Sequence, residues 1–174
     1  MSNDEHLRYP TGRFSPKEKY SQEELNELIN RIEAVPSKIE SEVSSLTNEQ
    51  LDSPYRPGGW TVRQVLHHLP DSHLNAYIRL KWTLTEDTPL IKAYDEKAWA
   101  ETLETKLDPS ISIQLLKALH NKWVAALRKL TEEDFSKSFI HPETQKHVTI
   151  GRQVATYAWH GEHHLGHILI VKNS

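Results

Sequence analysis

Histidines are the residues of this sequence whose type and spacing could do chemistry. Of the 11 His among 174 residues, four fall in the segment YAWHGEHHLGHI near the C-terminus. Residues four apart on a helix share a face, so an H-x-x-x-H pair can present two imidazoles to one metal ion. Two pairs are possible, His160 with His164 and His163 with His167. On a helical wheel His164 borders the apolar face and His160 lies beside it, whereas His163 points nearly opposite, which favours the first pair.

A third ligand could come from GGWTVRQVLHHLPDSH, which contains His67, His68 and His73. The wheel places His73 toward the core and the other two on opposite sides of it, so periodicity selects none of them. We expect His73 to be a packed, hydrogen-bonded core residue. The remaining histidines are expected at the surface, although a hairpin His could line a cleft: His6, His120, His141 and His147.

Periodic apolar residues predict the elements that must position these histidines. Ser21 with Glu24 and Thr61 with Gln64 form capping boxes that open the first two long helices, and Asp108 followed by Pro109 opens the third. The segment FIHPETQKHVT predicts a small hairpin before the last helix. Short connections and almost no strand indicate an all-α antiparallel four-helix bundle. The four helices are expected over residues 21–46, 61–84, 108–130 and 149–171.

Prolines and glycines predict where the chain departs from regular helix. Pro36 is expected to bend or restart the first helix, and Pro70 to kink the second just beyond its paired histidines. The first twenty residues predict an extended arm that lies on the bundle or on a partner subunit. A linker after residue 88 is expected to contain a short helical piece near residues 95–101. The whole chain, residues 1–174, is expected to be one domain.

Composition limits what the protein could bind. The formal net charge of -3, with basic residues scattered among acids, argues against nucleic acid as a partner. No apolar segment is long enough for a membrane span, and the polar N-terminus lacks the features of a secretory signal. With no Cys, any metal must be held by nitrogen and oxygen, and we expect a cytoplasmic protein that acts on a small molecule.

Three segments resemble a known family: GGWTVRQVLHHLPDSH, YIRLKWTLTEDTPLIKAYDEKAW and YAWHGEHHLGH look like the DinB/YfiT superfamily of metal-dependent bundles, closest to its YfiT-type hydrolases. The likeness runs from about Tyr9 to the C-terminus. In that superfamily the first ligand follows a Trp-Ser/Thr-Val opening by eight residues, which implies His68, and the last helix supplies His160 and His164. His167 stands where Gln is commoner.

The resemblance implies one catalytic divalent metal per chain, Zn²⁺ or else Ni²⁺, Co²⁺, Fe²⁺ or Mn²⁺. Three imidazoles leave coordination positions for water and substrate, as in catalytic sites. Such an ion could lower the pKa of bound water to about 7, which is hydrolase chemistry. The carboxylates nearest in sequence that could serve as a base are Asp71 and Glu162.

Two other functions are compatible with the same residues. Some members of the superfamily transfer a low-molecular-weight thiol such as bacillithiol to electrophiles, with the ion binding the thiolate and no general base needed. Arg63, Arg79 or Arg152 could then bind a carboxylate of the thiol. The third function is a non-enzymatic metal-binding bundle.

Tryptophans and the family likeness together predict a homodimer. The segments around Trp82, Trp99 and Trp123 carry more large aromatic surface than one small core usually hides.

Overall fold

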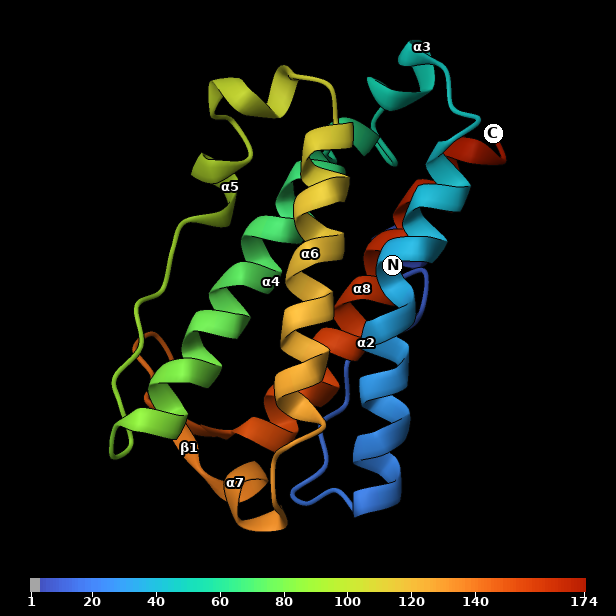
Figure 1. The fold of residues 1–174 in the computed structure, drawn as a ribbon. Coiled ribbons are helices and arrows are strands. Elements are labelled where there is room, and N and C mark those ends of the chain that lie inside the picture. The colour runs from blue at the N-terminus through green and yellow to red at the C-terminus, as the bar shows by residue number, and fades with distance from the viewer. Residues whose placement is uncertain (1–3) are drawn as a thin grey trace.

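The computed structural model describes residues 4–174 as a bundle of four long helices with a hairpin before the last (Figure 1). This confirms the predicted all-α four-helix bundle. The long helices are α2 (Gln22–Val43), α4 (Val62–Thr85), α6 (Ser110–Leu127) and α8 (Ile150–Lys172), and the hairpin pairs β1 (Ser138–His141) with β2 (Lys146–Thr149). The shorter α1 (Glu5–Arg8) precedes α2, and between the long helices lie α3 (Asn48–Leu51), α5 (Glu96–Trp99), η1 (Leu103–Lys106) and α7 (Glu132–Ser136).

The helices begin where their capping residues predict. Ser21 and Thr61 each accept a hydrogen bond from the backbone N–H three residues on, and Glu24 and Gln64 accept one in return from the cap backbone. At α6 the boundary moves by one residue: the N-cap is Pro109, and the Asp108 carboxylate accepts from the backbone N–H of Ser110. Both α2 and α4 continue through their internal prolines without a break.

Helices α2 and α8 run parallel to each other. Arg31 of α2 pairs with Glu162 of α8, and Glu42, further along α2, pairs with Lys172, further along α8. Gly161 permits this close approach, because a Cβ at that position would lie 2.6 Å from Cγ2 of Val35. Only glycine therefore fits there without a shift of the Val35 side chain or of α2.

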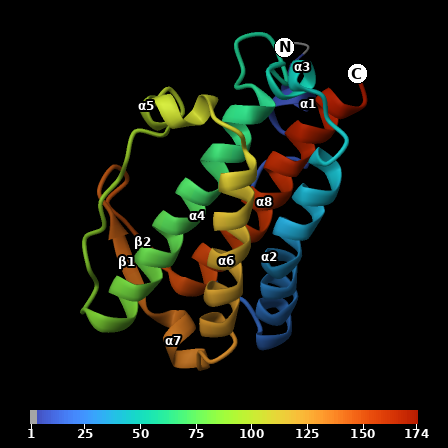
Figure 2. The same cartoon turned by 45° about the horizontal axis from the view of Figure 1, so that its top comes forward.

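Helices α4 and α6 also run parallel, and antiparallel to α2 and α8 (Figure 1). His67 hydrogen-bonds Ser112 near the start of both helices, and Lys122 lies over the Tyr77 ring further along both. The connection from residue 86 to 109 must therefore return along the length of the bundle before α6 begins, as Figure 2 shows. Across the two parallel pairs, α2 packs against α6, and α8 packs against α4.

A layer of histidines divides the core in two. One apolar cluster fills the end of the bundle near the hairpin, around Leu80, Trp123 and Ile150. The other fills the opposite end, around Leu66, Leu116 and Ile168. On α4, α6 and α8 the residues between these clusters include histidines, so polar side chains meet inside the bundle where apolar packing would otherwise continue.

The described part of the N-terminal arm, residues 4–20, lies against α8. The indole N–H of Trp159 donates to the Gly12 carbonyl at 3.0 Å. A Cβ at Gly166 would lie 2.7 Å from Cγ of Pro10, so the arm sits directly on the backbone of α8. The arm is helical over α1 rather than extended throughout, and its first three residues lie outside the described range. Among residues 4–174, no helix has the length and apolar character needed to cross a membrane.

Candidate metal centre

The packing of α4 against α8 brings together the three histidines predicted to bind metal. His68 comes from the second turn of α4, and His160 and His164 lie one turn apart on α8. One ring nitrogen from each lies within 4.8 Å of the others. Nε2 of His68 is 3.3 Å from Nε2 of His160.

These side chains fit a divalent ion. Two imidazole nitrogens bound to one tetrahedral Zn²⁺ at about 2.0–2.1 Å would be about 3.3–3.4 Å apart. The 3.3 Å between Nε2 of His68 and Nε2 of His160 matches that separation. Among the described residues, no carboxylate joins this group of ligand atoms, so its donor set is nitrogen alone, and the absence of Cys excludes sulfur ligands.

The histidines of the group are suited to bind as neutral ligands. Burial lowers the pKa of His68 to about 4, with a smaller contribution from His163. Burial also holds the pKa of His160 and His164 well below the ordinary value, and the neighbouring imidazoles lower it further. A neutral imidazole carries one lone pair that can coordinate a metal. The Trp60 ring covers His68, with ring centroids 4.8 Å apart.

His67 lies beside His68 in the sequence but faces α6 rather than α8. Its Nε2 donates to the Leu107 carbonyl at 3.3 Å, and its Nδ1 accepts from the Ser112 hydroxyl at 2.8 Å. Both nitrogens are thus occupied away from the candidate site. This placement favours His68 as the α4 ligand, the choice that helical periodicity left open.

His73 and His120 meet in the centre of the bundle. The expectation of a buried, hydrogen-bonded His73 is confirmed, since it is 0% exposed and its Nδ1 lies 2.8 Å from Nε2 of His120. The expectation of a surface His120 is wrong, because this residue is 1% exposed. A signal was present in the sequence: His120 follows Leu116 by four residues and precedes Trp123 by three, which places it on the apolar stripe of α6.

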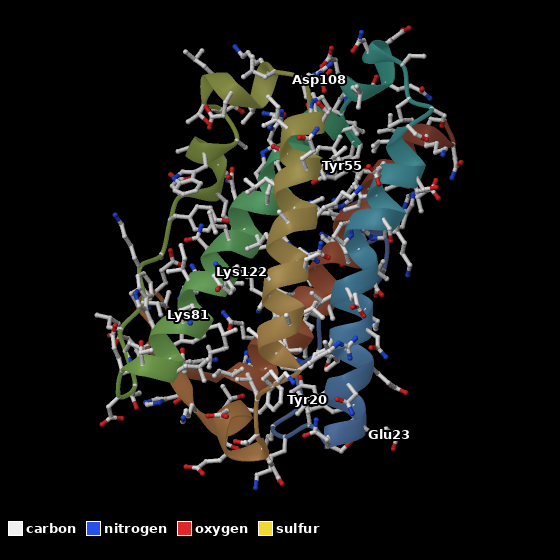
Figure 3. The ribbon with its side chains drawn as sticks, viewed as in Figure 1. Tyr20, Glu23, Tyr55, Lys81, Asp108 and Lys122 are labelled. Carbon is white, nitrogen blue, oxygen red and sulfur yellow. The ribbon has the colours of Figure 1, made fainter. Side chains whose placement is uncertain are left out.

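The helical wheel points His163 away from the apolar face of α8, yet this residue is not exposed to solvent. It is 8% exposed, because the N-terminal arm covers that part of α8, with the ring of Tyr9 on one side and that of Trp159 stacked against it. Together with His164 and His167 it forms a second group of ligand atoms within 4.8 Å. His167 stacks on Tyr55, labelled in Figure 3, with ring centroids 3.8 Å apart.

Neither predicted carboxylate base lies in the histidine group. Glu162 accepts a hydrogen bond from Arg31 Nε at 2.9 Å on the side of α8 that faces α2. Burial, with a contribution from Glu104 of η1, raises the pKa of Asp71 to about 6. Asp71 therefore lies toward the connection that contains η1.

A cavity of about 560 Å³ opens between α4, the linker around α5 and the hairpin. Three of its lining side chains carry a buried polar atom without a hydrogen-bond partner: Nε of Arg79, the hydroxyl of Tyr94 and Nδ1 of His141. Unpaired buried polar atoms are costly, so these atoms would be satisfied by water or by a polar ligand in the cavity. Arg63, by contrast, is bound to Asp52.

A four-helix bundle that gathers three imidazoles from α4 and α8 defines the class of protein. The chain belongs to the DinB superfamily, whose family model matches residues 31–168. It is 50% identical over 163 residues to "Putative metal-dependent hydrolase YfiT" of Bacillus subtilis, which covers 93% of this chain and 92% of that protein. A relative from Oceanobacillus iheyensis with the same description is 50% identical over 161 residues, 92% of this chain and 93% of the relative.

A solved structure agrees with the fold. Bacillus subtilis YfiT, described as a probable metal-dependent hydrolase with an unusual four-helix bundle topology, superposes with a TM-score of 0.94 at 48% identity, covering 97% of both chains. The parallel pairs α2 with α8 and α4 with α6 account for a topology that differs from a simple up-and-down bundle.

Proposed function

We propose that this protein is a metal-dependent hydrolase in which His68, His160 and His164 hold one divalent ion, most simply Zn²⁺. The observation that carries the proposal is the convergence of three imidazole nitrogens from α4 and α8 within 4.8 Å, without a carboxylate among them. The names of the relatives support hydrolysis as the reaction.

A bound ion at this position would supply Lewis acidity and lower the pKa of a coordinated water. The protein contributes three neutral ligands, so the full charge of the ion remains to act on the nucleophile. Three protein ligands leave at least one position for water or substrate. Trp60 and Tyr55 cover the end of the histidine group toward α3 and limit access from that side.

We propose that the cavity beside α4 receives a polar part of the substrate. Nε of Arg79 and the hydroxyl of Tyr94, both buried without a partner, would donate to a carboxylate, phosphoryl or carbonyl oxygen. Burial raises the pKa of both Tyr94, which lines the cavity, and Tyr157, and Ser72 is a neighbour of both. The Tyr157 ring in turn lies 5.5 Å from that of His160 in the histidine layer.

Thiol transfer is the alternative reaction, and one observation favours it. Asp71 and Glu162 both lie outside the histidine group, so a hydrolase would have to work without either as a direct base. A thiolate bound to the ion is already ionised and needs no base. The cavity would then bind a carboxylate of the thiol cosubstrate.

One experiment separates these functions. Metal-free and metal-restored protein would be assayed on a panel of esters and amides, and on electrophiles with and without small thiols. Metal-dependent turnover without a thiol supports hydrolysis, and turnover that requires a thiol supports transfer. His68→Ala should abolish either activity, whereas His67→Asn, the adjacent control, should retain it. If metal-free and metal-restored protein behave identically across the panel, both enzymatic functions are refuted and the non-enzymatic metal-binding bundle remains as the function.

A further inference from the structure

A continuous row of hydrogen-bonded imidazoles crosses the bundle and ends at His160. Nδ1 of His120 lies 2.7 Å from the Ile32 carbonyl oxygen on α2. Nε2 of His120 lies 2.8 Å from Nδ1 of His73, and Nε2 of His73 lies 3.1 Å from Nδ1 of His160. The row therefore joins α2, α6, α4 and α8.

The carbonyl at one end fixes every proton in this row. A carbonyl only accepts, so His120 must carry its proton on Nδ1, and a neutral His120 then accepts at Nε2. His73 must donate to it from Nδ1 and accept at its own Nε2. His160 must in turn donate from Nδ1, which leaves the lone pair of His160 on Nε2, the atom that faces Nε2 of His68 at 3.3 Å.

A second, shorter row fixes His164 in the same way. Nε2 of His167 lies 3.3 Å from the Arg8 carbonyl oxygen in the N-terminal arm, so His167 donates from Nε2 and accepts at Nδ1. Nδ1 of His164 lies 3.3 Å from that acceptor and must donate to it. His164 is likewise left with its lone pair on Nε2.

We propose that His73, His120 and His167 are positioning residues that lock His160 and His164 in the Nδ1–H tautomer, so that both aim Nε2 at one ion. The two rows end on backbone carbonyls, whose place is fixed by α2 and by the arm. The ligating nitrogens of His160 and His164 are thus set before any metal arrives. In the second row, Nδ1 of His164 and Nδ1 of His167 share a hydrogen bond, so these two atoms do not bind a second ion.

Outer partners of ligating histidines are often carboxylates, which make the imidazole more basic and add negative charge. Here the partners are neutral imidazoles and carbonyls. They orient the rings without reducing the charge of the site, which suits an ion that must acidify its nucleophile.

Nuclear magnetic resonance of metal-free protein labelled with ¹⁵N-histidine tests the proposal directly. Long-range ¹H–¹⁵N spectra distinguish the two tautomers of each neutral ring. We expect Nδ1–H for His73, His120, His160 and His164, and Nε2–H for His167. An Nε2–H form of His160 or His164 in the wild-type protein would overturn the proposal.

Paired variants separate positioning from packing. His120→Leu removes the acceptor for His73, whereas His120→Gln keeps an amide that donates to the Ile32 carbonyl and accepts from His73. We expect His120→Leu to lose the single tautomer of His160 and to bind Zn²⁺ about 10- to 100-fold more weakly. His120→Gln should restore both properties, and His67→Asn, a buried histidine outside both rows, should change neither.

The corresponding variants of the second row are His167→Leu and His167→Gln, with the tautomer of His164 as the readout. If His120→Leu does not fold, the wild-type spectra and the Gln variants still decide the proposal. The positioning role would be contradicted if His120→Gln and His120→Leu lost the same Zn²⁺ affinity while the His160 tautomer stayed unchanged in both. This inference rests on the proposed metal site, but the tautomers are read without metal, so correct tautomers in a protein that binds no ion would refute the function alone.

Discussion

Gly161 of α8 packs directly against Val35 of α2, and the backbone of α8 reaches α2 only because that residue has no side chain. A Cβ there would lie 2.6 Å from Cγ2 and 3.0 Å from Cγ1 of Val35. His160 precedes this contact in the chain, so the depth at which α8 sits also sets the position of a candidate ligand.

Gly161→Ala should therefore destabilise the protein, although alanine is the better helix former. We expect a loss of about 1–3 kcal/mol in the free energy of unfolding, the usual cost of an overpacked core, measured by urea denaturation. Gly151→Ala on the same helix is the matched control. Its nearest neighbours would lie at 3.5 Å or beyond, so it should be neutral or stabilising. Equal stability of the two variants would contradict the close contact.

The proposed ligands predict a selective loss of metal. His68→Ala, His160→Ala and His164→Ala should each lose tight binding, by more than the about 10- to 100-fold expected for an outer contact. His163→Ala should keep about one ion per chain, because one ion fits the group formed from α4 and α8. Elemental analysis of protein prepared without an affinity tag measures this. Metal loss in His163→Ala would instead point to the second group, with His164 and His167.

The buried histidines predict a metal-free protein that is sensitive to acid. Burial lowers the pKa of His68, His120, His163 and His167 to about 4 in the folded state. Below pH 6.5 the unfolded chain binds protons that the folded protein does not, so stability falls as the pH drops from about 6.5 to 4. These four groups alone give a slope of up to about 5 kcal/mol per pH unit, and the other buried histidines with lowered pKa values, His67, His73, His160 and His164, add to it.

Urea denaturation of chelator-treated protein at several pH values between 7.5 and 4.5 measures that slope. His120→Gln removes one of the titrating groups and should reduce the slope by about one proton, or roughly 1.4 kcal/mol per pH unit. A stability that stays constant over this range would show that the histidines titrate alike in the folded and unfolded states.

The sequence predicted local features well and long-range burial poorly. The capping boxes at Ser21 and Thr61 were predictable because they depend on residues three apart. The burial of His163 was not, since it depends on an arm that joins α8 from more than a hundred residues away. Periodicity also left His67 and His68 equivalent, because only the positions of α6 and α8 distinguish the two sides of α4.

Arg79 is expected to act in substrate binding and not in metal binding. Its Nε is buried without a partner in the cavity beside α4. A hydrogen bond from a charged donor contributes about 1.5–3 kcal/mol, so Arg79→Ala should raise KM by about 10- to 100-fold at unchanged metal content. Arg128→Ala, which removes an exposed ion pair with Glu33, is the control and should leave KM unchanged. An unaltered KM in Arg79→Ala would place the substrate elsewhere.

We propose that the protein is a homodimer, although one of the three tryptophans behind that expectation does not contribute. Trp123 is 0% exposed in the core, whereas Trp82 and Trp99 remain partly exposed. A stronger reason is a set of large apolar side chains in η1, just after it and at the start of α6 that are all exposed: Leu103, Leu107, Ile111 and Leu115. Exposed apolar side chains gathered in one stretch of the chain are typical of an interaction site.

Light scattering at micromolar concentration should report a dimer. The double variant Leu103→Ser with Ile111→Ser should shift it toward monomer, because both side chains, 81% and 60% exposed, would lose the apolar surface that association buries. Leu90→Ser is the control, since Leu90 is comparably exposed at 66% but lies outside this set. A monomeric wild-type protein would refute the dimer, and a dimer that survives the double variant would move the interface away from η1 and α6.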